Sequence, residues 1–279
     1  MRICLRSRRI NGKSFTHGQI PPDGFEYVGE GCPHDLVMED DVTMGGPKMA
    51  PAILFLPEAR WLTQARPDAE SFLMTLTNDA QNLANYPRAH WIAPFGTWVR
   101  DPSGGPKTRM CSMIASNKAH PVPGGYAMRR HVVRAVDRAR IRRHVDVYGT
   151  IVNLPIAEAD KEQVLIPYRF SVAIESQSYP WYHTEKLFDC FAAKTVPLYW
   201  GCEDGSKLRE WGFDTAGIVW WSDPDELVEK LTALDSDLYD SMLPAIETNY
   251  QRTWQLYCFE AALEEFLEKT GFFDRRHGL

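Results

Sequence analysis

Long apolar runs are missing from this sequence, and none approaches the length of about 20 residues that a transmembrane helix needs. We therefore expect no transmembrane segment. The first residues, Met1-Arg2-Ile3-Cys4-Leu5, are typical of a first strand and lack the pattern of a signal peptide. Together these features predict a soluble, cytoplasmic protein, either cellular or viral.

Cysteine is scarce as well, and no two cysteines form a C-x-x-C pair or a metal-ligand cluster. The six cysteines are scattered along the chain: Cys4, Cys32, Cys111, Cys190, Cys202 and Cys258. We expect reduced thiols of a cytosolic protein. A G-x-S-x-G nucleophile elbow and a Walker phosphate loop are also missing, so the sequence indicates neither an α/β-hydrolase nor a P-loop enzyme.

The composition is that of an ordinary globular protein, with 44% hydrophobic and 24% charged residues in a chain of 279. The formal net charge of -6 argues against non-specific wrapping around nucleic acid. One segment is strongly basic, with arginine at positions 129, 130, 134, 138, 140, 142 and 143. We expect a solvated helix face whose valines pack inward. The alternative is a surface for an anionic acceptor, such as nucleic acid or a phosphorylated glycan.

Short apolar runs alternate with turns and helical segments along the whole chain. We expect strands at 2–5, 36–38, 52–56, 72–76, 90–92, 110–116, 145–148, 170–174, 196–200 and 218–221. Helices are expected around 78–85, 128–139, 185–193 and 224–233, the last capped by Ser222 or Asp223, and over most of 236–268. This β-α-β alternation predicts the α/β class, with parallel sheets and right-handed crossovers.

A stretch rich in proline and glycine, 101–106, separates two such α/β units. We expect an N-terminal domain at 1–103, a C-terminal domain at 104–250 and a helical tail at 251–279. Ligands of such sheets bind beyond the carboxyl ends of the strands, so we expect a ligand cleft between the two domains.

The strand-to-helix turn after residue 174 carries the most informative residues. The strand should present Glu175 at its carboxyl end, and the next helix should begin near Thr184, with Glu185 and Lys186 in its first turn. A helix N-terminus offers unpaired N–H groups and a positive dipole end, which suit phosphate. Lysine there opposes the dipole preference, so an anionic ligand would explain it. On these residues alone, a threonine cap followed by a solvated Glu-Lys pair is the simpler interpretation.

The wider segment resembles the fucosyltransferases of glycosyltransferase family 10. Their signature runs approximately F-E-N-S-x-x-x-D-Y-V-T-E-K-L and, after a short spacer, V-P-[VIL]-[VY]-[WL]-G. This chain has I-E-S-Q at 174–177, W-Y-H-T-E-K-L at 181–187 and V-P-L-Y-W-G at 196–201. Upstream, Ser116-Asn117, Arg129 and V-D-V-Y-G at 145–149 are similar to the family's S-N…R…V-D-x-Y-G run.

The N-terminal half resembles the family less closely. A-I-L-F-L-P-E at 52–58 is similar to a strand that ends in the family's general base, and P-F-G at 94–96 is similar to the element that closes its first domain. The resemblance implies a GT-B-like fold, in which two Rossmann-like domains turn their parallel sheets to a central cleft. It also implies inverting, metal-independent transfer from a nucleotide-sugar donor, with GDP-fucose as the first guess, and no cofactor beyond this co-substrate.

The resemblance also assigns roles to individual residues. Glu58 would be the general base, Glu185 would bind the ribose of the donor, and Lys186 with Arg129 would clamp its diphosphate (Arg130 being the adjacent alternative). The donor-binding residues that it implies are Asn117, Arg129, Glu175, Ser176, Tyr182, Thr184, Glu185 and Lys186.

Acidic residues suggest one alternative site, because Glu39-Asp40-Asp41 is similar to the D-x-D metal motif of another glycosyltransferase fold. That motif is too short to be informative, so we expect a solvated acidic turn and predict no metal site.

Two departures from the signature concern the sugar. Ser176 replaces the usual asparagine and Trp181 the usual aspartate. Both positions fall where the sugar should be recognised, so the replacements affect the expected identity of the sugar more than the expected transfer reaction. One alternative keeps the fold but uses another nucleotide sugar and a non-glycan acceptor, such as a modified DNA base in a viral enzyme. Another is a non-catalytic sugar-nucleotide-binding protein. The acceptor is expected to be a glycan or another hydroxyl-bearing molecule, and the sequence predicts no oligomeric state.

Overall fold

The computed structural model of the chain describes residues 1–6, 17–29, 31–40, 50–58, 66–202 and 204–272. The chain forms two compact units, the first made of Met1–Gly96 with Gln255–Leu279 and the second of Thr97–Trp254. The sequence-based boundaries at 103/104 and 250/251 differ from these by a few residues. The expected tail at 251–279 belongs to the first unit from Gln255 onward in this division, and the cleft expected between domains stays a prediction.

The first unit contains a six-stranded sheet in the order β2-β1-β3-β4-β5-β6. All neighbouring strands are parallel. The strands are β1 (Arg2–Arg6), β2 (Glu26–Val28), β3 (Leu36–Glu39), β4 (Ala52–Leu56), β5 (Met74–Thr77) and β6 (Ala89–Trp91). Every residue of β3, β4 and β5 is buried, as expected for a parallel sheet that is covered on both faces.

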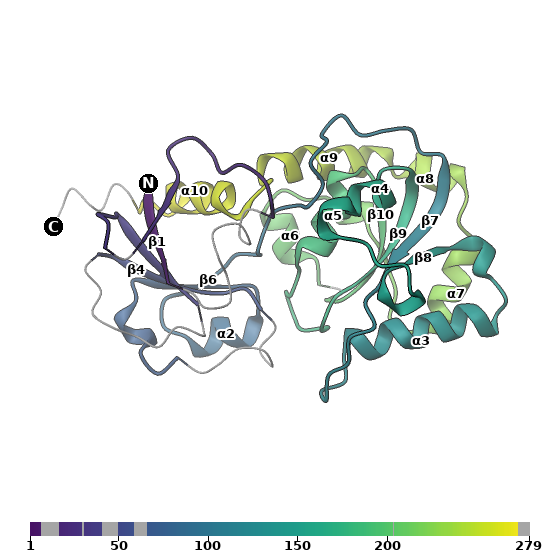
Figure 1. Cartoon of the computed structure of the whole chain (residues 1–279), viewed down its shortest axis with the longest axis horizontal. Coiled ribbons are helices and arrows are strands. Elements are labelled where there is room, and N and C mark those ends of the chain that lie inside the picture. The colour runs from purple at the N-terminus through teal and green to yellow at the C-terminus, as the bar shows by residue number, and fades with distance from the viewer. Residues whose placement is uncertain (7–16, 30, 41–49, 59–65, 203, 273–279) are drawn as a thin grey trace. The chain divides into compact units, whose positions relative to one another are not determined.

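Helices cover this sheet from two sides, with α10 (Phe259–Lys269) on one face and α2 (Ala80–Asn85) on the other (Figure 1). Phe259 stacks on Phe55 of β4, with ring centroids 4.2 Å apart, and this contact joins the C-terminal helix to the N-terminal sheet. Asp79 caps α2 by accepting hydrogen bonds from the N–H groups of the helix's second and third residues.

The acidic turn at the end of β3 is not solvated, so that expectation is wrong for Glu39 and Asp40. Their exposed fractions are 0% and 1%. Glu39 forms ion pairs with Arg66 at 2.7 Å and with Arg6 at 3.2 Å, and these two arginines compensate the cost of burying its charge. Asp41 lies outside the described residues.

The second unit contains a five-stranded sheet in the order β11-β10-β9-β7-β8, again with all neighbours parallel. Its strands are β7 (Arg109–Ile114), β8 (Asp146–Tyr148), β9 (Tyr168–Ile174), β10 (Val196–Trp200) and β11 (Val219–Trp220). The chain passes from β7 to β8 on one side and then returns to place β9 on the other. Such a reversal opens a crevice beyond the carboxyl ends of the two strands that flank it, here β7 and β9.

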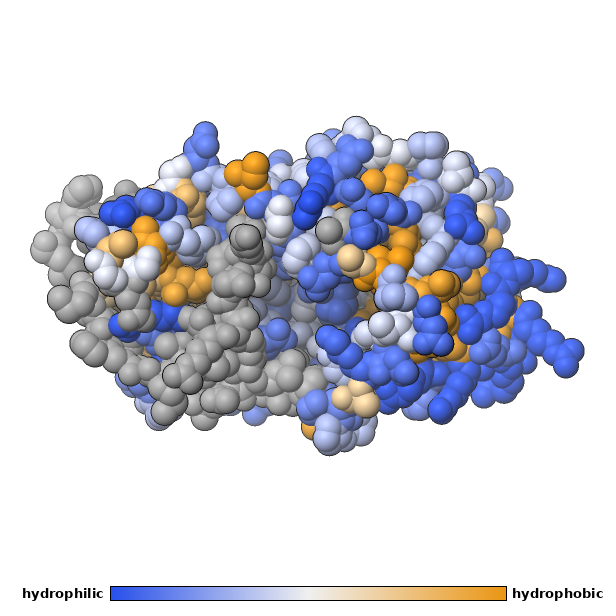
Figure 2. Space-filling model, viewed as in Figure 1, coloured by the Kyte–Doolittle hydropathy of each residue, from blue (hydrophilic) through white to orange (hydrophobic). Residues whose placement is uncertain are grey.

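The helices of this unit lie on both faces of its sheet (Figure 1). On one face are α3 (Gly125–Arg138) and α7 (Pro224–Thr232), while α4 (Lys161–Leu165) and α5 (Glu185–Ala192) lie on the other. Val132 and Val136 of α3 pack into the core as predicted. The outward face of α3 is hydrophilic (Figure 2), with Arg134 and Arg138 exposed and Arg138 paired with Asp225.

The remaining helices are α6 (Ser206–Glu210), α8 (Ser236–Ser241) and α9 (Leu243–Gln255). The predicted elements are present with ends shifted by a few residues, and Asp223 is the cap of α7. Strand β2 and helices α4 and α6 were not predicted. Among the described residues, no helix is both long enough and apolar enough to cross a bilayer.

Candidate functional site

Polar side chains gather at the carboxyl edge of the second sheet. Ser116 follows β7, Glu175 follows β9 and Tyr199 is the last residue but one of β10, so all three lie at or near the ends of parallel strands. Helices α3 and α5 begin in the loops that leave β7 and β9. Their N-terminal turns therefore supply the other side chains of this site.

Two glycines bring the start of α3 against the chain that leaves β9. The N–H of Gly125 donates a hydrogen bond to the carbonyl of Ser176 at 2.9 Å. A Cβ atom on Gly125 would lie 1.6 Å from the carbonyl oxygen of Glu175, and one on Gly124 would lie 2.7 Å from that of Ser176. Only glycine permits this approach of backbone to backbone, and these glycines were not singled out from the sequence.

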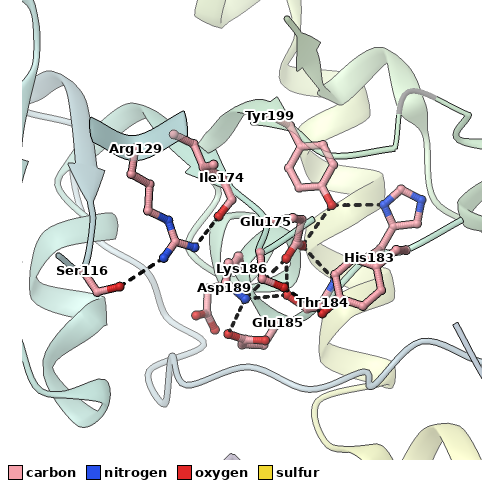
Figure 3. A network of polar contacts seen from close by, with 12 residues as sticks. Ser116, Arg129, Ile174, Glu175, His183, Thr184, Glu185, Lys186, Asp189 and Tyr199 are labelled. Carbon is pink, nitrogen blue, oxygen red and sulfur yellow. Dashed lines mark hydrogen bonds and ion pairs between the residues drawn. The ribbon is translucent and has the colours of Figure 1, made fainter. Parts of the chain in front are cut away.

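Arg129 projects from the second turn of α3 into this edge, and its side chain is held at both ends of the guanidinium (Figure 3). Nη1 donates to Ser116 Oγ at 3.1 Å and Nη2 to the carbonyl of Ile174 at 2.7 Å. Arg129 is only 6% exposed. Burial lowers its pKa, against the smaller effects of Tyr126 and Glu175, but a guanidinium stays protonated. Both hydrogen bonds use uncharged oxygens, so its positive charge is available to an anion.

Lys186 provides a second cation, in the first turn of α5. Its Nζ lies 2.8 Å from Thr184 Oγ1, 3.1 Å from Glu185 Oε1 and 3.3 Å from Glu175 Oε2. Burial works against its charge, but the carboxylates of Glu175 and Glu185 outweigh burial and raise the pKa of Lys186 well above its ordinary value. Lys186 is therefore not part of a solvated surface pair. Its side chain retains 28% exposure, and that of Glu185 retains 23%.

Glu175, at the end of β9, is hydrogen-bonded to the end of β10 and to the start of α5, and it is completely buried. Its Oε1 accepts from the Thr184 N–H at 2.9 Å and from the Tyr199 hydroxyl at 2.9 Å, and its Oε2 accepts from Thr184 Oγ1 at 2.7 Å (Figure 3). Thr184 is the N-cap residue of α5, as predicted, but its hydroxyl is used by Glu175 and makes no cap hydrogen bond.

Tyr199 extends this network to His183, whose Nδ1 lies 3.2 Å from the tyrosine hydroxyl. Burial lowers the pKa of His183 to about 4, against the opposing effect of Asp204. Burial and the neighbouring carboxylate of Glu175 raise the pKa of Tyr199 far above its ordinary value. Both groups are therefore neutral near pH 7, and the only charges of the network are those of the carboxylates and the cations.

The two positions that depart from the family signature lie beside this network. Ser176 Oγ is 3.2 Å from the Tyr182 hydroxyl, and both residues are buried. Trp181 has a φ of 64°, which is rare for a bulky residue. Its backbone N–H donates to Cys202 Sγ at 3.0 Å and its indole N–H to Asp204 at 2.7 Å, and these contacts fix the loop.

The structure thus brings together most of the residues expected to bind the donor: Arg129, Glu175, Ser176, Tyr182, Thr184, Glu185 and Lys186. Asn117 lies just beyond β7, exposed, with its N–H bonded to Thr150 Oγ1 at 2.9 Å. Glu58 lies just after β4 in the first unit and is partly buried. Within the described ranges, no group of three or more His, Cys, Asp or Glu side chains is arranged to hold a metal ion.

Sequence reasoning missed two residues of this network, Ser116 as a partner of Arg129 and Tyr199 as a partner of Glu175. One feature of the sequence indicates a hydrogen-bonding role for Tyr199: it carries the only hydroxyl in the buried strand V-P-L-Y-W. A buried tyrosine hydroxyl needs a hydrogen-bond partner. The sequence alone did not identify that partner, because 24 residues separate it from Glu175.

The comparison with known families matches residues 105–243 to the family model described as "Glycosyltransferase family 10 (fucosyltransferase) C-term". No curated protein matches the sequence. Three solved structures have a fold similar to that of this chain. An alpha1,3-fucosyltransferase with GDP is 14% identical, with a TM-score of 0.58 over 95% of this chain and 88% of that one.

An alpha1,3-fucosyltransferase with GDP-fucose is 15% identical, with a TM-score of 0.55 over 87% of this chain and 80% of that one. An alpha-glucosyltransferase in complex with UDP and a 13-mer DNA is 10% identical, with a TM-score of 0.52 over 93% of this chain and 89% of that one. At these identities the likeness shows the fold, which is the GT-B fold of two α/β units with parallel sheets.

Proposed function

Since this chain is a glycosyltransferase of GT-B fold that resembles family 10, we propose that it transfers a sugar from a nucleoside diphosphate to an acceptor hydroxyl. GDP-fucose is the first candidate donor. The family description and a similar structure solved with GDP-fucose support this choice. The acceptor is a glycan or another hydroxyl-bearing molecule.

One observation carries the proposal, namely that two cations from different helices meet at one strand edge. Both residues belong to the network at the carboxyl edge of the second sheet (Figure 3), and the charge of Arg129 slightly opposes the rise in the pKa of Lys186 that Glu175 and Glu185 cause. Like charges repel, and a fold that holds them together gains stability when an anion lies between them. The N-terminal end of α5 adds its dipole to the same place. A diphosphate fits this arrangement.

These groups would assist departure of the nucleoside diphosphate. As the bond between the anomeric carbon and the diphosphate oxygen breaks, negative charge builds on that oxygen. Arg129 and Lys186 would stabilise this charge, which is the role that a divalent metal has in other transferases. Transfer would thus be metal-independent, with no cofactor besides the donor. Glu185, still partly exposed beside Lys186, would accept hydrogen bonds from the ribose diol.

Glu58 would act as the general base on the acceptor. It would take the proton of the attacking hydroxyl, whose oxygen attacks the anomeric carbon from the face opposite the nucleotide. The configuration at that carbon would then invert. Glu58 follows the buried strand β4, a rigid support at the carboxyl edge of the first sheet. On the donor side, Ser176, Tyr182 and Asn117 would line the sugar and nucleotide subsites.

A thermal-shift screen with GDP-, UDP-, CMP- and dTDP-sugars tests the donor. A ligand at about 100 times its Kd should stabilise the protein by about 2.7 kcal/mol. We expect GDP-fucose to raise the melting temperature most. We also expect the protein to hydrolyse or transfer the donor sugar in the presence of EDTA, since the proposed reaction needs no metal. A shift with UDP-sugars and none with GDP-sugars would replace the proposed donor but leave the diphosphate site in place.

A second candidate keeps the fold and replaces both donor and acceptor. The similar alpha-glucosyltransferase was solved with UDP and DNA, and α3 of this chain has exposed arginines at 134 and 138. A nucleic-acid acceptor would therefore be paired with a UDP-sugar. Incubation with a UDP-[14C]-sugar and DNA carrying hydroxylated bases tests this candidate, and a lack of labelled DNA would reject it.

A further inference from the structure

The carboxylate of Glu175 has no capacity left for a ligand. Its oxygens accept three hydrogen bonds: Oε1 accepts from the Thr184 N–H and the Tyr199 hydroxyl, and Oε2 accepts from Thr184 Oγ1. The remaining side of Oε2 faces the Lys186 ammonium in an ion pair at 3.3 Å, so protein groups surround all of the roughly four acceptor positions of this carboxylate. Its exposed fraction is 0%. A donor molecule therefore cannot reach Glu175 without breaking this network.

Lys186, by contrast, depends on its neighbours for a fixed position. A lysine side chain loses rotamer entropy when it is held in one conformation. In the first turn of a helix its charge also opposes the helix dipole. Glu185 on the same helix offsets part of both costs at 3.1 Å. Glu175 is the partner from outside the helix, and it acts directly at 3.3 Å and through Thr184 Oγ1, which donates to Glu175 and accepts from Lys186.

Hydrogen bonds on the side away from Lys186 also hold the Glu175 carboxylate in place. Because a carboxylate only accepts, the Tyr199 hydroxyl donates to Glu175 and can accept from His183 Nδ1. Both partners are buried. The carboxylate is thus anchored on β10 and on the loop before α5, and its second oxygen is left facing the ammonium.

We propose that Glu175 is a positioning residue, which holds the Lys186 ammonium against the donor diphosphate and does not itself contact the donor. This inference rests on the proposed function, because it needs a diphosphate at Lys186. It differs from what the family resemblance implies, since the resemblance groups Glu175 with the donor-binding residues. It also predicts that loss of Glu175 weakens the binding of ligands that carry a diphosphate, because Lys186 contacts only the phosphates. Ligands without phosphates should bind as before.

The test compares a nucleoside diphosphate with its own nucleoside, the base being whichever of GDP, UDP, CDP and dTDP binds the wild type best. In the Glu175→Gln variant the amide keeps the shape of the side chain but has no negative charge, so the ion pair with the Lys186 ammonium is lost. We expect the Kd of the diphosphate to rise about tenfold, the loss of about one charge-assisted hydrogen bond. The Kd of the nucleoside, measured by ligand-observed NMR, should stay unchanged.

Two further variants separate positioning from general damage. Glu39→Gln is the matched control, because Glu39 is also a buried, ion-paired carboxylate, paired with Arg66 at 2.7 Å, but belongs to the first unit and not to this network. It should lower the melting temperature without changing the ratio of the two Kd values. If Glu175→Gln does not fold, Tyr199→Phe removes one donor to the carboxylate more gently, and it should weaken only the diphosphate, by about threefold.

A double-mutant cycle with Lys186→Ala completes the test. In the Lys186→Ala background, Glu175→Gln should have no further effect on the diphosphate. Equal weakening of nucleoside and diphosphate in the folded Glu175→Gln variant would overturn the inference, and so would full additivity with Lys186→Ala. The proposed function fails differently, if Lys186→Ala alone leaves diphosphate binding at the wild-type level.

Discussion

Arg129 and Lys186 carry the same charge in different surroundings. Lys186 has two carboxylates within 3.3 Å of its Nζ, whereas the hydrogen bonds of the Arg129 guanidinium go to a hydroxyl and a carbonyl. The lysine is therefore largely neutralised before a ligand binds, and the arginine is not. Arg129 should therefore contribute more of the electrostatic attraction for an anion. Lys186 should contribute more to the orientation of the bound anion.

Among the proposed roles, that of Glu58 as general base is the easiest to isolate. Replacing Glu58 with glutamine removes the acceptor of the hydroxyl proton, so kcat should fall by about a hundredfold or more. The donor should bind as before, because Glu58 is proposed to contact only the acceptor. Initial rates and a donor titration check this, with the exposed Glu70→Gln of the same unit as control. Unchanged kcat in Glu58→Gln would remove Glu58 from the mechanism.

The sequence predicted the charged residues of the site better than their partners. Glu185 and Lys186 follow from a motif that is local in the chain and from the chemistry of a helix start. Ser116 and Tyr199 could not be predicted in the same way, because their roles depend on which strand ends become neighbours. The burial of Glu39 was mispredicted for the same reason, since Arg66 is 27 residues away.

At the scale of elements, the approach of α3 to the end of β9 places Arg129. The approach is possible only because Gly125 has no side chain, since its Cβ would overlap the carbonyl of Glu175. Gly125→Ala should therefore displace the start of α3 and lower the free energy of unfolding by about 1–3 kcal/mol. It should also weaken binding of the nucleoside diphosphate, since Arg129 would move with the helix.

Urea unfolding and a diphosphate titration measure both effects of Gly125→Ala. Gly31→Ala is the control, because no atom of the described part of the chain lies within 4 Å of a Cβ at that position. If Gly125→Ala unfolds at the same urea concentration as the wild type and binds the diphosphate equally well, the close approach has no role in the site.

The same scale explains which elements could be predicted. Strands such as β4 and β10 are continuous apolar runs, and burial on both faces makes them recognisable in the sequence. Strand β2 has three residues, and its pairing with β1 joins residues about 24 positions apart. Helices α4 and α6 have five residues each and no side-chain cap hydrogen bond. Such short elements form through tertiary contacts that no local pattern reports.

At the scale of the whole molecule, the first unit joins the two ends of the chain through a buried acid. Glu260 of α10 accepts a hydrogen bond from the Tyr27 hydroxyl and has an exposed fraction of 0%. Burial raises the pKa of Glu260 above its ordinary value, against the opposing effect of Tyr27. The stability that its protonated form contributes is complete below the unfolded pKa, about 4.3, and is lost as the pH rises through the folded pKa.

Glu260→Gln should remove this pH dependence. The amide oxygen can still accept from Tyr27, so the variant should match the wild type near pH 4 and become the more stable of the two as the pH rises. The neighbouring Cys258 does not interfere, because burial raises its pKa to about 12. Denaturant unfolding at several pH values checks the difference between the two proteins. A difference that is constant with pH would mean that Glu260 does not titrate with folding.

The central claim is that the carboxyl edge of the second sheet holds the diphosphate of a nucleotide sugar. A crystal structure of the chain with its best nucleoside diphosphate tests this most directly. We predict phosphate oxygens within hydrogen-bonding distance of Arg129 and Lys186, at about 2.7–2.9 Å, with Glu175 still bonded to Thr184 and Tyr199. A diphosphate bound elsewhere, with neither cation in contact, would contradict the account.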